Sequence, residues 1–342
     1  MHLFIFNLST DDNDSLLAFT QEWVSAFRNY CEEITVISTH VGSHSLPQEI
    51  EVIEIGGGNF FLRIRGLIRL IKIGFKIISK RKTAVVFHHM SPRTAEILGP
   101  LFKLARIKQG LWYSHSYPSK ELRFAARIVD KVFSSSANSL PIRSTKARFV
   151  GHGINISKFI NIEESDRKKA VLSLGRITKI KNNEELIYAV AKSKRINKEI
   201  HLVGPLGKSK NYLHELIELG AKNGVEVIYL GNYDHRLVPD LLASYSVCYT
   251  GNPNTVDKSV IEGALCGCFT LAAQEFVLSQ TGMSRVLKEC KVDFNSDLSN
   301  QLNQIDSISD RVELRKLLAQ TAAEINDVKR TTQKILKELI ER

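Results

Sequence analysis

The sequence predicts an α/β protein in which two Rossmann-like domains face each other across a cleft and a C-terminal helix packs back across both. Short apolar runs alternate with helical patterns along almost all of the 342 residues, which is typical of βαβ units and parallel sheets. The alternation occurs as two series, separated by a polar, charged stretch at 161–169. A chain of this length also forms two domains more readily than one.

The first series occupies residues 1–160 and is expected to form the N-terminal Rossmann-like domain. Apolar runs predict strands at 2–6, 33–37, 49–53, 84–87, 110–113, 131–134 and 148–150. Between them, apolar residues recur at helical spacing over 14–27, 60–79 and 93–105, which predicts helices that cover the sheet.

The second series, after an interdomain linker at 161–169, occupies residues 170–309 and is expected to form the C-terminal Rossmann-like domain. Strands are predicted at 170–174, 199–203, 226–230, 247–250 and 268–272. Helices are predicted at 183–193, 209–222, 236–243 and 258–265. The tail at 310–342 is one long helical pattern without a clean heptad, so we expect a packed helix rather than a coiled-coil arm.

The net charge and the cysteine content limit which ligands and cofactors the protein is expected to bind. The net charge of +11 favours anionic ligands. Five cysteines without a paired spacing indicate reduced thiols in the cytosol and no metal or other cofactor. We find no signal peptide, no membrane-spanning run and no nucleic-acid-binding motif. The expected protein is cytoplasmic, either free or bound to a membrane from the side, and does not bind nucleic acid.

Two cations follow the strand predicted at 170–174, where the loops of a parallel sheet gather. Arg176 offers a planar fork for two phosphate oxygens and Lys181 offers a point charge. Together they are suited to neutralise the charge on a departing nucleoside diphosphate. The alternative is that these are ordinary surface cations.

A second candidate phosphate-binding element is a predicted helix start about eighty residues after Arg176. Asn254 or Thr255 is expected to cap a helix that begins near Val256, and Asp257 complements its dipole. Free amide groups around Ser259 are suited to hold a phosphate.

Glu262 lies about a turn and a half into that helix and is suited to accept hydrogen bonds from two ribose hydroxyls. The alternative is an ion pair with Lys258, four residues earlier. That order of charges is the weaker one on a helix, and the neighbouring positions are apolar. We therefore favour the ligand role.

Two histidines stand at predicted strand ends that should open on the cleft. His89 follows the strand at 84–87 and His115 follows the strand at 110–113. Both are candidates for contact with a substrate, and His88 is expected to face the core. A structural role is the alternative for each.

These motifs resemble the retaining GT-B glycosyltransferases of family 4 (glycosyltransferases group 1). The resemblance rests on Gly175-Arg176 with Lys181, on Glu262-Gly-Ala-Leu-Cys-Gly267, and on segments at 129–136 and 151–155. It implies that Gly204 borders the nucleotide base. It also implies that His89 or His115 steadies the donor sugar and that the departing phosphate takes the acceptor proton without a metal. Asn254 stands where the family has a glutamate that touches the transferred sugar, and Asp257 with Lys258 is the nearest substitute.

The segment from Ile55 to Ala95 contains no acidic residue. Five of its cations share one helical stripe, which we expect to face a membrane: Arg65, Arg69, Lys72, Lys76 and Lys80. Basic amphipathic helices bind anionic membrane surfaces. The alternative is a sheet-covering helix with solvated lysines.

The predicted function is transfer of a hexose from a UDP- or GDP-sugar to an acceptor hydroxyl with retention, as the resemblance implies. The domain at 1–160 is then expected to bind the acceptor, and the domain at 170–309 is expected to bind the nucleotide-sugar donor. A lipid-linked or cell-envelope glycan as acceptor fits the basic helix. The protein is then expected at the inner face of the membrane. The alternatives are a sugar-nucleotide epimerase on the same fold and a non-catalytic subunit that binds nucleotide or a partner enzyme.

Overall fold

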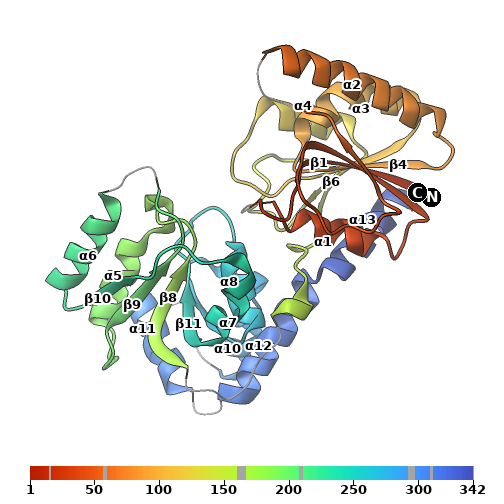
Figure 1. Ribbon diagram of the computed structural model, residues 1–342. Coiled ribbons are helices and arrows are strands. Elements are labelled where there is room, and N and C mark those ends of the chain that lie inside the picture. The colour runs from red at the N-terminus through yellow and green to blue at the C-terminus, as the bar shows by residue number, and fades with distance from the viewer. Residues whose placement is uncertain are drawn as a thin grey trace. The chain divides into compact units, whose positions relative to one another are not determined.

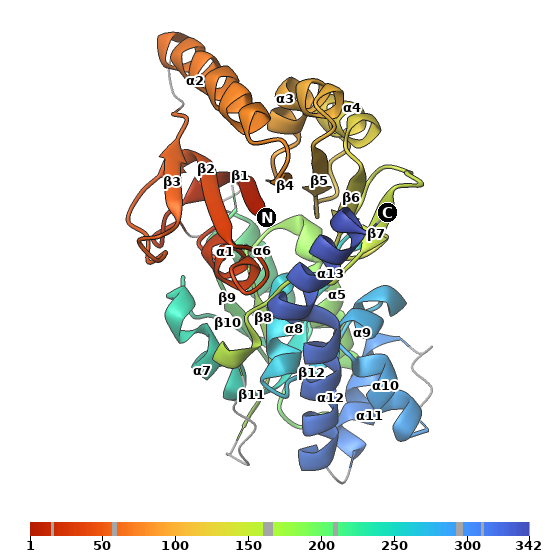
Figure 2. The same cartoon turned by 90° about the vertical axis from the view of Figure 1, so that its right-hand side faces the viewer.

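The computed structural model describes residues 1–14, 17–56, 60–159, 167–207, 211–291, 297–308 and 311–341. The chain forms two compact units (Figures 1 and 2): Met1–Asn155 with Asp327–Arg342, and Ile156–Asn326. Each unit contains one parallel sheet, of seven strands in the first and five in the second. The predicted α/β class with two Rossmann-like units is therefore confirmed.

The first unit is built on the strands β1 (His2–Thr10), β2 (Glu33–Val41), β3 (Glu51–Glu54), β4 (Ala84–His89), β5 (Lys108–Trp112), β6 (Lys131–Ser134) and β7 (Ala147–Phe149). Its helices are α1 (Thr20–Phe27), α2 (Phe60–Ser79), α3 (Pro92–Leu104), α4 (Lys120–Ile128) and α13 (Val328–Ile340). The strand order is β3-β2-β1-β4-β5-β6-β7. The chain thus changes direction across the sheet between β1 and β4.

Alternation along β1 explains how this sheet is covered. Leu3 and Ile5 join a core with α1 and α13, whereas Phe4 and Phe6 join a core with α2 and α3. Successive side chains of a strand point to opposite faces, so a strand that is apolar throughout is buried between two helical layers. Figure 1 shows α1 and α13 on one side of the strands and α2, α3 and α4 on the other.

The second unit is built on β8 (Lys168–Leu174), β9 (Glu199–Val203), β10 (Glu226–Tyr229), β11 (Tyr245–Tyr249) and β12 (Phe269–Leu271). Its helices are α5 (Asn183–Lys192), α6 (Tyr212–Lys222), α7 (Val238–Ala243), α8 (Lys258–Leu265), α9 (Glu275–Gln280), α10 (Met283–Glu289), α11 (Leu298–Ser307) and α12 (Arg311–Asn326). The order β10-β9-β8-β11-β12 reverses between β8 and β11.

Some helices differ from the sequence prediction. Helices α4, α9, α10 and α11 were not predicted. The prediction of one continuous tail helix is wrong, since α12 ends at Asn326 and α13 begins at Val328. Asp327 breaks the helix with an extended ψ of 129° and accepts a hydrogen bond from the amide of Lys329. Of the predicted linker at 161–169, residues 161–166 lie outside the described residues and Lys168 already belongs to β8.

Candidate functional site

The reversal of strand order between β8 and β11 positions the candidate site in the second unit. In open α/β sheets, ligands bind beyond the carboxyl ends of the strands at such a reversal. The loop after β8 contains Arg176 and Lys181, and the loop after β11 leads into α8 with Asp257 and Glu262. The topology therefore places the predicted phosphate-binding and ribose-binding groups on the two loops that flank this point.

An ion pair joins the two loops. Lys181 Nζ lies 2.6 Å from Asp257 Oδ2, and both side chains are about five-sixths buried, with exposures of 16% and 14%. Asp257 is also held by Thr250, whose hydroxyl donates to Oδ2, and by Asn252, whose amide donates to Oδ1 over 3.2 Å. These contacts fix the position of the Asp257 carboxylate, and the carboxylate in turn positions the Lys181 ammonium.

Asn252 organises the loop between β11 and α8. Its Oδ1 accepts hydrogen bonds from the amides of Asn254 at 3.1 Å and Thr255 at 3.3 Å. Such side-chain-to-backbone bonds hold a turn in place of secondary structure. Helix α8 therefore begins at Lys258 with Asp257 at its N-cap, and the prediction that Asn254 or Thr255 caps it is wrong.

Two glycines bring the loops after β8 and β9 into contact. Gly175 and Gly204 have φ angles of +136° and +134°, a region that favours glycine. A Cβ on Gly204 would lie 2.3 Å from the carbonyl oxygen of Gly175, and a Cβ on Gly175 would lie 3.1 Å from Lys181 Nζ. The Lys181 side chain thus folds back over Gly175, and Gly204 lies directly against that turn.

Glu262 is buried in α8, with 4% exposure. Lys258 Nζ lies 3.3 Å from Glu262 Oε1, so the ion pair that the sequence disfavoured is present. Its geometry is not that of a hydrogen bond, and Oε1 accepts none from the described residues. Ser259 Oγ donates to the carbonyl of Leu174 over 2.9 Å, which ties the first turn of α8 to the end of β8.

Arg176 and Asn254 lie at the surface of the same loops. The Arg176 side chain is exposed and takes part in no ion pair among the described residues. Asn254 is also exposed, and its amide is bonded to Asn252. The loop after β8 therefore combines the exposed cations Arg176 and Lys179 with the partly buried Lys181.

His89 occupies an aromatic enclosure in the first unit. Its ring stacks on Trp112 at a centroid distance of 4.9 Å and an angle of 3°, and contacts Trp23 at 4.9 Å. The residue is 2% exposed, and neither ring nitrogen has a partner among the described residues. Burial lowers the pKa of His89 to about 3, so the ring is neutral. This placement does not support the prediction that His89 touches a donor sugar.

The other two histidines of these strands differ from each other. His88 is buried and its Nδ1 lies 2.8 Å from Thr94 Oγ1, as expected for a core residue. Burial lowers its pKa to about 3. His115 is exposed, and its Nδ1 accepts a hydrogen bond from the amide of Tyr117 over 3.0 Å. Of the two candidates, His115 is the one that a solute can reach in this structure.

The five predicted membrane-facing cations lie on or just after α2, and all are exposed. Arg69 Nη1 donates to the carbonyl of Glu54 over 2.7 Å. Lys76 pairs with Glu51 at 3.2 Å and Lys80 with Glu33 at 3.7 Å. These three cations therefore have partners on β2 and β3 or directly after them, whereas Arg65 and Lys72 have no ion pair among the described residues.

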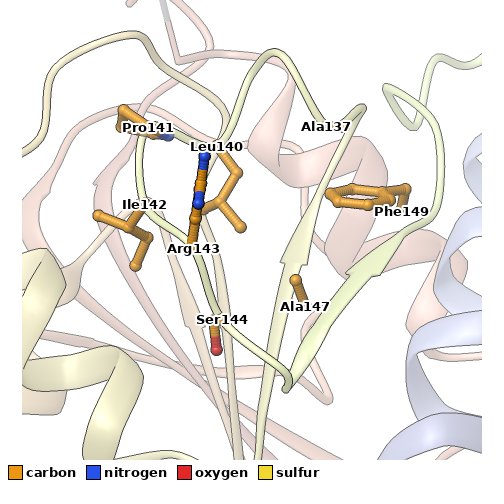
Figure 3. A pocket seen from close by; sticks show the side chains of 8 residues that line it. All are labelled: Ala137, Leu140, Pro141, Ile142, Arg143, Ser144, Ala147 and Phe149. Atoms are coloured by element: carbon orange, nitrogen blue, oxygen red, sulfur yellow. The ribbon is translucent and has the colours of Figure 1, made fainter.

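A depression of about 400 Å³ lies beside β7 in the first unit (Figure 3). Its lining consists of Ala137, Leu140, Pro141, Ile142, Arg143, Ser144, Ala147 and Phe149. This lining has one cation and no carboxylate. It lacks the paired charges of the loops after β8 and β11, so we place the candidate site at those loops.

The described residues contain no group of three or more His, Cys, Asp or Glu side chains placed to hold a metal ion. In the same part of the chain, no helix combines the length and apolarity needed to cross a membrane.

Thr250 and Asn252 are the site residues that the sequence reasoning missed. The sequence Thr250-Gly-Asn252-Pro directly after a strand indicates a structured turn, since Thr and Asn side chains often form hydrogen bonds with nearby backbone groups. That both would converge on Asp257 depends on the fold of the loop, which the sequence pattern does not specify.

The architecture described above is the GT-B fold of nucleotide-sugar glycosyltransferases. HepE from Anabaena, solved with UDP, superposes with a TM-score of 0.72 at 15% identity over 99% of each chain. A glycosyltransferase from Rickettsia africae superposes with a TM-score of 0.69 at 16% identity over 100% of this chain and 99% of that one.

The lipopolysaccharide outer core galactosyltransferase WaaB, without ligand, gives a TM-score of 0.66 at 11% identity over 99% of each chain. No protein-family model and no curated protein sequence matches the chain. At these identities the likeness establishes the fold.

Proposed function

We propose that the protein transfers a hexose from a nucleoside diphosphate sugar to an acceptor hydroxyl with retention of configuration, in the manner of family 4. The proposal rests first on Glu262, a buried carboxylate whose Oε1 accepts no hydrogen bond from the described residues. Lys258 balances the charge of this carboxylate at 3.3 Å, but a buried acceptor without a hydrogen-bond donor is still costly. Two ribose hydroxyls would supply such donors. The structures solved with UDP or UDP-glucose share this fold.

The phosphates would bind at the loop after β8. The Lys181 ammonium is positioned by its ion pair with Asp257. Arg176, on the same loop, is exposed to solvent. During transfer the bond between the sugar C1 and the phosphate oxygen breaks, and the acceptor oxygen bonds to C1. The acceptor proton passes to the departing phosphate, on the same face of the sugar. The two cations stabilise the charge that develops on that phosphate.

The remaining predicted residues take supporting roles in this proposal. Gly204 borders the base, and the amides near Lys258 and Ser259 face a phosphate. Asp257 and Asn254 take the role of contacts to the transferred sugar, and the exposed His115 takes the role of the family's histidine. No metal takes part, because the cations and the helix start supply the positive charge.

The acceptor in this proposal is a lipid-linked or cell-envelope glycan, held by the first unit. The cations Arg65 and Lys72 on α2 are exposed and have no ion pair among the described residues, which favours an anionic surface as a partner. The protein would then work at the inner, cytoplasmic face of a membrane.

Thermal unfolding with UDP, GDP and ADP tests the nucleotide site. A ligand held at about 100 times its dissociation constant adds about 2.7 kcal/mol to the free energy of unfolding. We expect one base to stabilise the wild type, and Glu262→Ala to lose most of that stabilisation. Glu226→Ala is the control, since Glu226 is exposed at the start of β10. Equal stabilisation of all three proteins would refute the assignment of Glu262.

A second candidate function is a non-catalytic subunit that binds nucleotide. Asn254 favours this candidate, because it replaces the glutamate with which the family contacts the transferred sugar. The test is whether adding an acceptor increases the release of nucleoside diphosphate from the donor. A transferase shows this increase, whereas neither a binding subunit nor an epimerase does. The anomeric configuration of the product, measured by proton nuclear magnetic resonance, tests retention.

A further inference from the structure

Helix α2 has three different faces over its described side chains. One face is buried against α3 and the sheet, and comprises Gly66, Leu70, Ile73, Gly74 and Ile77. A second face carries the cations. Figures 1 and 2 show α2 along the outside of the first unit, with α3 beside it. A helix that only covers a sheet has an apolar face and a polar face, so the third face requires a separate explanation.

The third face is apolar and exposed. Its residues are Ile64 (43% exposed), Leu67 (44%), Ile68 (50%), Ile71 (36%) and Phe75 (60%). Positions 64, 68, 71 and 75 are spaced by four, three and four residues, so they form one continuous stripe along the helix. Single exposed apolar residues are ordinary, whereas a contiguous apolar patch marks a site of interaction.

The apolar stripe borders the cationic face directly. Stepping 100° per residue around the helix, Arg65 and Lys72 fall beside the stripe, on the side away from the buried face. Neither forms an ion pair among the described residues, and α2 carries no acidic residue. An apolar strip with cations along one edge matches the boundary between the acyl chains and the phosphates of an anionic leaflet.

We propose that α2 is an interfacial helix that inserts this stripe into an anionic membrane leaflet, with Phe75 and Ile68 among the acyl chains and Arg65 and Lys72 at the lipid phosphates. The inference rests on the membrane partner in the proposed function, and it changes how that partner is bound. Apolar insertion, rather than attraction of the cations alone, holds the protein on the surface.

A second copy of the chain is the competing occupant of the stripe. Charge argues against it, because a second α2 would bring its own cations and no carboxylate to balance Arg65 and Lys72. Like charges placed opposite each other across an interface are unfavourable. An anionic leaflet supplies the missing counter-charge.

Flotation with vesicles of phosphatidylcholine, with and without phosphatidylglycerol, tests the proposal at low and high salt. Wild type is expected to float with the anionic vesicles and to keep a bound fraction at high salt, because apolar insertion is not screened. The double variant Ile68→Ser with Phe75→Ser is expected to bind about tenfold more weakly. Ile196→Ser is the matched control, since Ile196 is a fully exposed apolar residue of the second unit.

Phe75→Trp gives a direct reading of insertion. Trp23 and Trp112 are 2% and 4% exposed, so a blue shift of emission on adding vesicles reports the new side chain. Binding that vanishes at high salt, with no blue shift, would overturn insertion. A wild-type dimer that Ile68→Ser with Phe75→Ser converts to a monomer, without vesicle binding, would assign the stripe to a second copy. Binding of UDP by the same variants is measured in parallel, so that failure of the nucleotide site is seen separately.

Discussion

Lys181 Nζ lies 2.6 Å from Asp257 Oδ2, and the two residues belong to loops that follow different strands. The pair spans the point between β8 and β11 where the strand order reverses. It prepositions the ammonium, but it also leaves a carboxylate beside the place proposed for a diphosphate. In the proposed function, the diphosphate and Asp257 therefore share the Lys181 ammonium.

Asp257→Asn should strengthen UDP binding, because it removes a negative charge beside the bound phosphates. We expect about a tenfold lower dissociation constant, which corresponds to about 1.4 kcal/mol. Lys181→Met should weaken binding instead. Titration calorimetry measures both. If Asp257→Asn weakens binding as much as Lys181→Met does, then the carboxylate acts by holding the lysine in place or by contacting the ligand.

Glu262→Gln should weaken UDP binding by about tenfold to a hundredfold, since hydrogen bonds to a charged group contribute about 1.5–3 kcal/mol. Deoxyribose analogues of UDP sharpen this test. Wild type should bind 2′-deoxy- or 3′-deoxy-UDP more weakly than UDP, and Glu262→Gln should discriminate less between them. Unchanged discrimination in the variant would show that other groups hold the ribose.

Gly204→Ala should destabilise the second unit, because its φ of +134° disfavours alanine and the new Cβ would lie 2.3 Å from the carbonyl oxygen of Gly175. Gly224→Ala is the control, since φ there is +67° and nothing lies within 4 Å of the new Cβ. We expect a loss of about 1 kcal/mol for the control, from backbone strain alone, and about 3 kcal/mol for Gly204→Ala. Urea unfolding measures both, and equal losses would refute the close contact between the two turns.

The stability of the protein should depend on pH through His89. Its pKa is lowered from 6.5 to about 3 by burial, so between these values the unfolded chain binds more protons than the native one. The stabilising contribution is complete above about pH 6.5 and is lost as the pH falls toward 3, by about 1.4 kcal/mol per pH unit within that window.

His89→Phe should reduce this loss, because phenylalanine suits the aromatic enclosure and does not titrate. It should leave stability at neutral pH nearly unchanged, since neither His89 ring nitrogen has a partner among the described residues. His88→Phe is the contrasting variant, because it also removes the hydrogen bond to Thr94 and should cost stability at neutral pH. Denaturant unfolding from pH 4 to 8 checks both expectations. An undiminished slope in His89→Phe would show that His89 is not the titrating group.

Much of the secondary structure could be predicted from local pattern. The bounds predicted for β6, β9, α2 and α8 agree with those observed, because apolar periodicity and turn residues are local properties of the chain. The residues of the candidate site could be chosen for the same reason, since Arg176, Lys181 and Glu262 follow predicted strands and a predicted helix start.

The partners of those residues depended on tertiary structure. Side chains 76 positions apart meet in the Lys181–Asp257 pair, and which of Asn254, Thr255 and Asp257 begins α8 was decided by the turn around Asn252. The burial of His89 also depended on tertiary structure, because its ring is enclosed by Trp23 of α1 and Trp112 of β5. Sequence by itself determined the order of the elements and the chemistry they carry. The packing of distant segments decided which charges are paired, which carboxylate is buried and which apolar stripe stays exposed, because contact energies act between neighbours in space.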